Sequence, residues 1–247
     1  MASSSLPGPP QAPPPASAKV KVKTTWPTIP PNTDRKPIRT ERLLLRPITA
    51  TDVEAIYQLR TQPEVMLWTL LGTVDKDVDE SRAFIERFLS PKDLKTFNFA
   101  VVYLGDDDKS ENADGVLIGT AGVHKILPES GWAEAGYMFR KEYWNKGLAT
   151  EAMRALTKAW WALARTEIEL EVDAASVEKR GEKSEGGVMQ VPEILTALIE
   201  TSNIGSQRVL EKAGFKEYKT WTEPDSRAGF EGRTATLVLF LLEAPDS

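Results

Sequence analysis

The chain has 247 residues, of which 41% are hydrophobic and 27% charged, a balance that suits one soluble domain with appendages or at most two small domains. It has no cysteine and a single histidine, His124, which excludes disulfides, thiolate metal sites, a cysteine nucleophile and a metal site built on several histidines. The formal net charge of −5 argues against a nucleic-acid binder, which is normally basic.

The sequence shows no membrane segment and no secretion signal. Its longest apolar run, Leu237 to Leu242, is far too short to span a bilayer. Its N-terminus lacks the charged-then-apolar pattern of a signal peptide. We therefore expect a cytoplasmic or nucleocytoplasmic protein without nucleic-acid or membrane partners. The sequence does not choose between a monomer and a homodimer.

Residues 1–37 are predicted to form a disordered tail. They hold ten of the 17 prolines and show no apolar period. Such a segment buries too little apolar surface to offset the entropy lost on ordering, so polyproline-like disorder is expected. Lys19, Lys21 and Lys23 are interpreted as solvated residues of this tail. The folded domain is expected over residues 38–247.

The first half of this domain shows alternating strand and helix patterns, with prolines and an acidic turn at the boundaries. The expected elements are a strand over 41–48, a helix from 51 that ends before Pro63, a loop over 65–74, a helix over 77–89, strands over 97–104 and 116–126 that form a hairpin, and a strand over 133–139.

The second half begins with a helix from Ala149 to about Ala164, whose apolar residues form one stripe. Residues 166–190 are charged and have no sustained period of apolar residues. We therefore interpret 176–190 as a mobile insertion, and a strand over 167–172 is an alternative that the sequence leaves undecided. Three further elements complete the pattern: a strand over 194–199, a helix after Asn203 that ends at Gly214, and a closing strand pair over 216–221 and 233–242.

The segment from Gly136 to Met153 predicts an anion site. A strand, a turn that contains Gly147 and a helix N-terminus follow one another. The first N–H groups of a helix lack intrahelical partners and lie at the positive end of its dipole, where they favour a phosphate or diphosphate. Neither G-x-x-x-x-G-K-[ST] nor G-x-G-x-x-G is present, which excludes the common nucleotide loops.

Two motifs carry a resemblance to a known family. Trp144-Asn-Lys-Gly-Leu-Ala149 resembles the pyrophosphate loop of the GNAT N-acetyltransferases, although Trp144 replaces Gln/Arg and Asn145 replaces a frequent Gly. The stretch from Asn203 to Phe215 (Asn-x-x-Ser-x-x-x-Leu-x-Lys-x-Gly-Phe) looks like the second GNAT element. The wider string from Gly136 is similar to the RimJ/RimL-like branch.

The resemblance implies an α+β fold: a mostly antiparallel sheet of six or seven strands, splayed between the fourth and fifth strands and flanked by helices. It further implies an N-acetyltransferase that moves an acetyl group from acetyl-CoA to a primary amine, without a metal. The implied CoA-binding residues are Tyr137, Met138, Phe139, Trp144, Asn145, Lys146, Gly147, Leu148, Ala149, Thr150, Asn203 and Ser206.

For catalysis, the resemblance implies Ser206 beside the CoA sulfur, and Glu134 on the fourth strand is the candidate general base, acting through a water. Each residue also has an alternative, structural role: Ser206 would satisfy the backbone at the start of its own helix, and Glu134 would be a charged residue at the edge of a strand. Asn203 is likewise a plausible helix N-cap. Many family members carry a helix tyrosine that protonates the departing thiolate; that position here is Leu210, so this role is absent.

The acceptor is predicted only as a class, a protein N-terminal amine or a small-molecule amine. Trp68 and Trp132 are expected to border its site as an aromatic wall, with partly buried loop residues as the alternative. The acidic net charge favours a cationic acceptor. A competing hypothesis is a catalytically weak acyl-CoA-binding or interaction module on the same fold, which the missing helix tyrosine motivates.

Overall fold

A computed structural model describes residues 18–105, 115–126, 130–178, 182–183 and 188–245. Its helices are α1 (Val53–Arg60), α2 (Pro63–Met66), α3 (Val78–Glu86), α4 (Leu148–Trp161) and α5 (Ile204–Lys212). Its strands are β1 (Lys19–Pro27), β2 (Ile38–Arg39), β3 (Leu43–Pro47), β4 (Phe97–Tyr103), β5 (Val116–Ile126), β6 (Ala133–Phe139), β7 (Arg165–Asp173), β8 (Glu182–Lys183), β9 (Met189–Gln190), β10 (Ile194–Glu200), β11 (Lys216–Pro224) and β12 (Thr234–Glu243).

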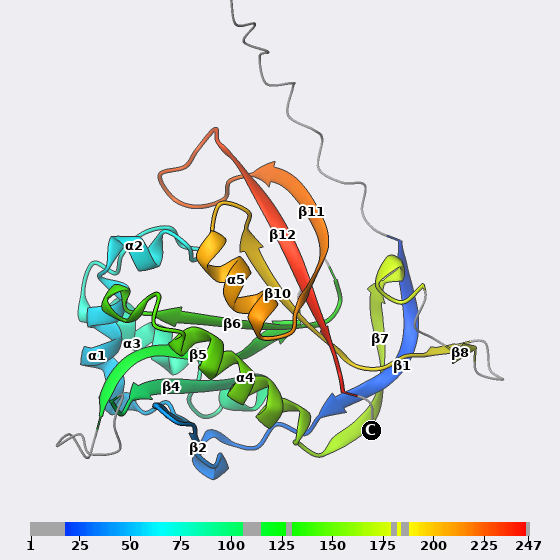
Figure 1. The fold of residues 1–247 in the computed structure, drawn as a ribbon, viewed down its shortest axis with the longest axis horizontal. Helices are drawn as coiled ribbons and strands as arrows, with labels where there is room; N and C mark the ends of the chain where they lie inside the picture. Colours follow the sequence, from blue (N-terminus) through cyan, green and yellow to red (C-terminus); the bar gives the residue numbers. More distant parts are fainter. Residues whose placement is uncertain (1–17, 106–114, 127–129, 179–181, 184–187, 246–247) are drawn as a thin grey trace, which may run out of the picture.

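The centre of the molecule is an eight-stranded sheet in the order β11-β12-β10-β6-β5-β4-β3-β2 (Figure 1). Its neighbouring strands pair antiparallel except for β10 and β6, which run parallel. Without the two-residue β2 it has the seven strands that the sequence predicts. The expected α+β architecture is therefore confirmed.

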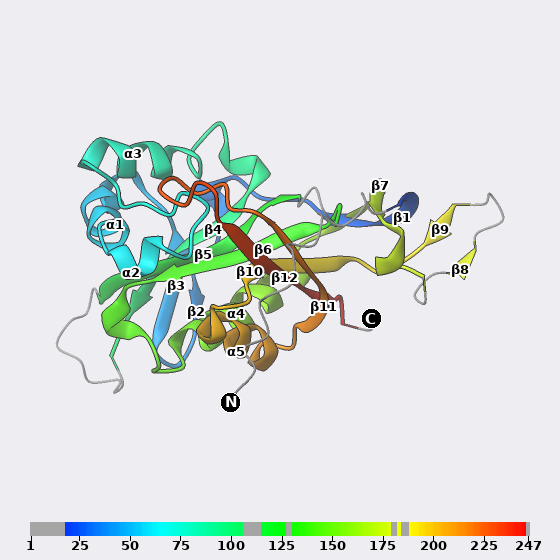
Figure 2. The same cartoon turned by 90° about the horizontal axis from the view of Figure 1, so that it is seen from above.

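Helices cover both faces of this sheet. Figure 2 shows α1, α2 and α3 on one side and α4 and α5 on the other. Ile56 of α1 and Ile85 of α3 are buried against one face. Met153 of α4 and Leu210 of α5 are buried against the opposite face. Each helix thus contributes one apolar stripe to a core, as their amphipathic patterns predict.

The large sheet opens between β6 and β10. Their register pairs only Leu195 with Ala133 and Thr196 with Glu134, and the Thr196 hydroxyl donates a 2.9 Å hydrogen bond to the Ala133 carbonyl. Beyond these pairs, β6 continues to Phe139 without a β10 partner in this register. The predicted splay between the fourth and fifth strands is confirmed, and it leaves backbone groups of β6 facing a gap.

The prediction of disorder over residues 1–37 is wrong for Lys19–Pro27. These residues form β1, which pairs with β7 over its whole length in a second sheet of order β7-β1-β9-β8. Val22 and Thr24 of β1 are buried, whereas Lys21 and Lys23 are exposed and lie opposite Glu171 and Glu169. Opposite charges at facing positions stabilise a strand pair. Residues 1–17 lie outside the described residues.

The segment after β1 is also ordered, because a buried arginine fixes it to the sheet. The Arg35 guanidinium donates to the carbonyls of Asp93 and Thr96 at 2.6 Å and to that of Asn98 at 3.3 Å. Burial lowers the pKa of Arg35 to about 10. Trp26 adds an edge-to-face contact with Trp160 of α4, with ring centroids 6.1 Å apart. The folded unit therefore begins before residue 38.

The prediction of a mobile insertion over 176–190 also differs from the structure where the chain is described. Ser176 and Val177 are buried, and the Ser176 hydroxyl accepts a hydrogen bond from the Trp132 indole. β9 (Met189–Gln190) pairs with β1 and with β8 (Glu182–Lys183), so this segment supplies two strands of the second sheet. The strand over 167–172, which the sequence left open, is present as β7.

Candidate active site

A pocket of about 520 Å³ lies where β6 and β10 diverge. Strand β6, the turn before α4, α5 and the segment after α2 all contribute to its wall. Of the predicted site residues, it brings together Trp68, Tyr137, Met138, Phe139, Trp144, Asn145, Gly147, Leu148, Ala149, Thr150, Asn203 and Ser206. Two motifs that lie more than 50 residues apart in sequence thus meet in one cavity.

The turn before α4 has a backbone that presents helix N–H groups to this pocket. Asn145 has φ +60° and Gly147 has φ +79°, both left-handed values, and Gly147 is the N-cap of α4. Asn tolerates this region better than most residues and Gly adopts it freely, which accounts for both residue types. The Glu151 N–H donates to the Gly147 carbonyl at 3.1 Å, so the preceding helix N–H groups, Leu148 to Thr150, have no helical acceptor.

Glu151 anchors this turn to the segment between β2 and β3. Its carboxylate accepts hydrogen bonds from the Thr40 hydroxyl at 2.6 Å and from the Arg42 guanidinium at 2.7 and 2.9 Å. Arg42 also donates to the Lys146 carbonyl at 3.0 Å. Burial alone would raise the pKa of Glu151, but these hydrogen bonds outweigh it and lower the pKa below its usual value. The turn is therefore fixed before Gly147 by the hydrogen bond to the Lys146 carbonyl and after it by those to the Glu151 carboxylate.

The start of α5 lies across the pocket from this turn. Asn203 is the N-cap of α5, because its side-chain oxygen accepts a 3.1 Å hydrogen bond from the Ser206 N–H. The Ser206 hydroxyl accepts a 3.0 Å hydrogen bond from the Tyr137 phenol of β6. Burial raises the pKa of Tyr137 to about 12, against a smaller opposite effect of Ser206. Leu210, at the position of the missing helix tyrosine, is buried in the core.

The pocket has a positive electrostatic character. Its lining residues, as far as the chain is described, include no Asp or Glu, whereas Arg208 and Lys212 contribute positive charges from α5. The N-terminus of α4 adds the positive end of a helix dipole. This combination of helix N–H groups and cationic side chains suits an extended anionic ligand that carries a diphosphate.

Three predicted site residues do not line the pocket. Trp132 is fully buried in the core beneath the second sheet, where its indole N–H donates to Ser176 at 3.0 Å, so its assignment to an acceptor wall is wrong. Glu134 lies at the paired end of β6, opposite Thr196, before the strands diverge. Its role as a general base stays a prediction. Lys146 contributes its carbonyl to Arg42 and is outside the lining.

Several lining residues were not predicted. They are Val65, Thr69, Tyr143, Ser202, Ile204, Gly205, Arg208, Val209 and Lys212. Those on α5 follow a signal that was present in the sequence, because Ile204, Arg208 and Lys212 are four residues apart and therefore share one face of the helix that begins after Asn203. The residues after α2 had no such signal, since their position depends on how a loop packs.

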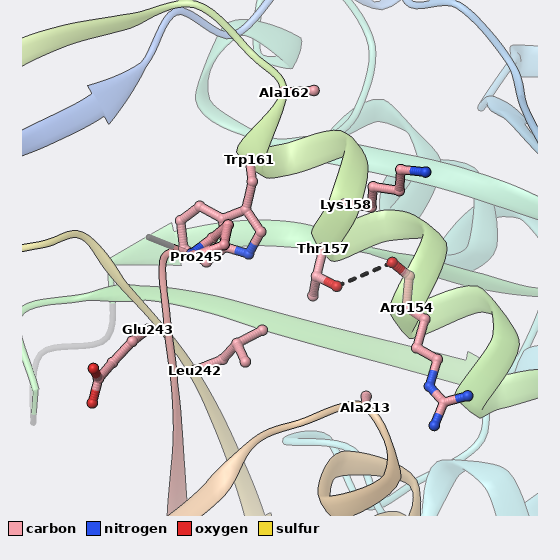
Figure 3. A pocket seen from close by; sticks show the side chains of 9 residues that line it. All are labelled: Arg154, Thr157, Lys158, Trp161, Ala162, Ala213, Leu242, Glu243 and Pro245. Atoms are coloured by element: carbon pink, nitrogen blue, oxygen red, sulfur yellow. Dashed lines mark hydrogen bonds between the residues drawn. The ribbon is translucent and has the colours of Figure 1, made fainter. Parts of the chain in front are cut away.

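A second hollow, of about 510 Å³, lies between the end of α4 and the end of β12. Figure 3 shows Arg154, Lys158 and Trp161 along α4, and Leu242, Glu243 and Pro245 at and after the end of β12. The Arg154 guanidinium already donates to the Lys212 carbonyl. No predicted site residue lines this hollow, so the pocket between β6 and α5 is the candidate active site.

The described residues contain no group of three or more His, Asp or Glu side chains that is arranged to hold a metal ion. None of the described helices has the length and apolar character needed to cross a membrane.

Residues 42–216 match the family model of the GNAT acetyltransferase domain, and the protein therefore belongs to the GNAT acetyltransferase family. Among curated relatives, an uncharacterized N-acetyltransferase of Bacillus licheniformis is 31% identical over 121 residues, which are 47% of this chain and 61% of that protein. A second, from Bacillus subtilis, is 26% identical over 117 residues, with the same shares. The match thus spans less than two thirds of these relatives.

Solved structures show the same fold at low identity. A GNAT acetyltransferase of Bacillus anthracis is 22% identical, with a TM-score of 0.57 over 85% of this chain and 100% of that chain. A RimL ribosomal L7/L12 acetyltransferase in complex with coenzyme A is 12% identical, with a TM-score of 0.56 over 84% and 98%. Spermidine N-acetyltransferase of Vibrio cholerae is 15% identical, with a TM-score of 0.56 over 83% and 97%.

Proposed function

We propose that this protein is an acetyl-CoA-dependent N-acetyltransferase, which transfers the acetyl group directly from the CoA thioester to a primary amine in a ternary complex. One observation carries the proposal: a single pocket joins the α4 N-terminus, the unpaired edge of β6 and the start of α5, and its described lining has no carboxylate. Family membership agrees with this activity.

Binding is assigned to backbone groups. The N–H groups from Asn145 to Thr150 would hold the diphosphate, because those of the first turn of α4 have no helical acceptor. The edge of β6 from Tyr137 to Phe139 would hold the pantetheine arm like an added strand. One N–H of this edge would donate to the thioester oxygen, where negative charge develops. Asn203 would lie beside the same arm.

Acetyl-CoA supplies the reactive thioester, so the protein needs no covalent enzyme intermediate. Its side chains have three tasks: to orient the two reactants, to keep the amine neutral and to stabilise charge on the oxygen and the sulfur. Ser206, which lines the pocket and is hydrogen-bonded by Tyr137, would donate to the sulfur. Glu134 would accept the ammonium proton through a water.

Calorimetric titration of the full chain with acetyl-CoA, followed by thiol release over a panel of amines and peptides, tests the proposal. Binding with release supports the transferase. Binding without release across the whole panel would favour an acyl-CoA-binding module, and absence of binding would overturn the assignment of the pocket.

A further inference from the structure

One arginine outside the pocket joins two of its walls. Arg227 lies on the loop between β11 and β12 and is not among the lining residues. Its guanidinium donates a 2.8 Å hydrogen bond to the Leu67 carbonyl, just after α2, and lies 2.8 Å from a carboxylate oxygen of Glu200, at the end of β10. Figure 2 shows this loop beside the segment that follows α2. The two contacts lead to two different walls of the candidate active site.

The first wall consists of residues on either side of Leu67. Val65, Trp68 and Thr69 line the pocket. Their backbone hydrogen bonds are local, since the Trp68 N–H donates to the Val65 carbonyl at 3.2 Å and the Thr69 N–H donates to a carbonyl of α2 at 3.0 Å. The contact from Arg227 joins the same segment to a distant part of the chain. The position of this wall relative to the rest of the pocket therefore rests in part on Arg227.

The same arginine contacts this segment a second time, five residues after Leu67. Gly72 has φ +70°, a value that favours glycine, and an added Cβ there would lie 2.8 Å from the Cβ of Arg227. A side chain at residue 72 would therefore force the segment and Arg227 apart. Two contacts with one side chain thus enclose residues 68–71, and they limit how far Trp68 can move from the β11–β12 loop.

The second wall is the turn that leads into α5, where Ser202 and Asn203 line the pocket. Glu200 holds both residues, because its carbonyl accepts from the Asn203 N–H at 2.9 Å and its carboxylate accepts from the Ser202 hydroxyl at 2.6 Å. The Arg227 guanidinium pairs with the other oxygen of that carboxylate. A continuous chain of contacts thus runs from the turn before α5 to the wall that carries Trp68.

All three nitrogens of the Arg227 guanidinium take part in this arrangement. Besides its contacts with Leu67 and Glu200, the guanidinium forms a bidentate pair with Asp225. A planar fork reaches several acceptors at fixed angles, whereas a lysine ammonium is a point charge on a flexible stem. Hydrogen bonds from Arg227 lower the pKa of Asp225, so the pair stays charged at neutral pH. An arginine is therefore suited to fix three segments relative to one another.

We propose that Arg227 is a positioning residue for the acceptor amine, because it fixes the wall that carries Trp68 relative to the turn that carries Ser202. The inference rests on the proposed function, in which β6, the turn before α4 and the start of α5 hold acetyl-CoA. Part of the lining that this assignment leaves for the amine lies on the segment after α2. A misplacement of about 1 Å can cost about 100-fold in rate, so Arg227 affects the amine without contact with it.

Steady-state kinetics of the full chain, with the amine and acetyl-CoA each varied in turn, test this role. The amine is the one that wild-type protein acetylates fastest in a panel that includes spermidine, benzylamine and a peptide that begins Ser-Ser. Arg227→Met removes the guanidinium and keeps an unbranched side chain. It should raise the KM for the amine at least about 5-fold, the scale of one lost hydrogen bond, and leave the calorimetric Kd for acetyl-CoA within about 2-fold of the wild type.

Arg233→Met is the matched control. Arg233 follows on the same loop, and its guanidinium lies 5.1 Å from the centroid of the Phe230 ring, against 4.5 Å for Arg227. Among the described contacts, those to Leu67 and Glu200 come from Arg227 and not from Arg233. The control should keep the wild-type KM. If Arg227→Met does not fold, Arg227→Lys, which keeps the charge but not the planar fork, takes its place with the same expectation.

Hydrogen–deuterium exchange gives a second readout that needs no acceptor. In Arg227→Met the amides of residues 67–72 should exchange at least about 5-fold faster than in the wild type, because the segment loses its contact with the β11–β12 loop. The amides of α4 should exchange as in the wild type. A general loss of stability would instead raise exchange in both segments.

The outcomes separate this inference from the proposed function. An unchanged amine KM in Arg227→Met, an equal rise in Arg233→Met, or unchanged exchange over residues 67–72 would each overturn the positioning role while the transferase stands. A loss of acetyl-CoA affinity as large as the rise in amine KM would also overturn it, since the whole pocket would then be disturbed. Binding of acetyl-CoA without acetylation across the whole panel would count against the transferase, and exchange would still decide whether Arg227 fixes this wall.

Discussion

The phenol of Tyr137 on β6 donates a 3.0 Å hydrogen bond to the hydroxyl of Ser206 on α5, across the opening where the central sheet divides. A hydroxyl that accepts from one partner keeps its own hydrogen for another. Tyr137 thus directs the Ser206 hydrogen away from itself. The Ser206 N–H donates to the Asn203 side chain, so the backbone and the side chain of Ser206 each have one hydrogen-bond partner.

Tyr137→Phe is expected to lower kcat about 5-fold and to change the KM for acetyl-CoA little. The phenyl ring keeps the packing but loses one hydrogen bond, worth about 1 kcal/mol. Steady-state kinetics with saturating amine measure both constants. Ser206→Ala is the companion variant, and the double variant should be no slower than the worse single one. Independent, multiplicative losses would contradict a shared role.

The pH dependence of the wild-type rate gives a further check on this pair. Because burial raises the pKa of Tyr137 to about 12, the phenol stays protonated below about pH 10. No loss of kcat from its ionisation is therefore expected between pH 7 and pH 9.5. A fall in kcat over this range that Tyr137→Phe abolishes would contradict the assignment.

Gly147→Asp is expected to abolish measurable binding of acetyl-CoA. It places a carboxylate at the N-terminus of α4, where the diphosphate is proposed to bind. Gly147→Asn is the matched control, since it has the same shape, tolerates the φ of +79° better than most residues and carries no charge. Calorimetry should show at least about 10-fold weaker binding for Asp than for Asn. Equal affinities would contradict a diphosphate at this turn.

Glu134→Gln tests the general base. If Glu134 accepts the amine proton through a water, turnover at pH 7 should fall about 100-fold with nearly unchanged CoA affinity, a loss within the usual range for proton transfer. The loss should be smaller for an acceptor with a lower amine pKa. Unchanged turnover at neutral pH would show that Glu134, which lies at the paired end of β6, acts only as a structural residue.

Glu151→Gln is expected to destabilise the protein by about 2 kcal/mol at pH 7, the scale of hydrogen bonds to a charged group. The folded-state pKa of Glu151 is lowered, so its stabilisation is present above its unfolded pKa of about 4.5 and is lost as the pH falls through the folded value. Denaturant unfolding of both proteins from pH 3 to pH 8 measures this. The difference should shrink toward acid; a difference that grows toward acid would contradict the assignment.

Most of the elements from residue 38 onward were predictable, as was the meeting of the two motifs, but α2, β8 and β9 were not. The strand over 133–139, the helix cap at Asn203 and the turn at Gly147 each have strong local signals, namely an apolar run, an N-cap residue and a glycine before a helix. Predictions from such signals are reliable because they depend only on residues that are close in sequence and not on tertiary packing.

Predictions failed where distant residues decide the outcome. The alternation of Lys and Val over residues 19–23 was itself a strand pattern, but the prolines around it outweighed it, and its partner β7 lies about 140 residues away. Trp132 was predicted to be a loop residue, because no feature of the sequence around it indicates that it is buried in the core beneath the second sheet. The segment after α2 is held by a hydrogen bond from Arg227 to the Leu67 carbonyl, which joins residues 160 positions apart.

The position of β1 also has a consequence for synthesis. Pro27 pairs with Arg165 and Lys19 with Asp173, so β1 leaves the ribosome long before its partner exists. At roughly 5 to 20 residues per second, the wait is on the order of ten seconds. Throughout that time the strand has two open edges, and its alternating lysines are the kind of charge that discourages pairing with the wrong chain. The same lysines that later face glutamates on β7 thus serve first as protection for a nascent strand.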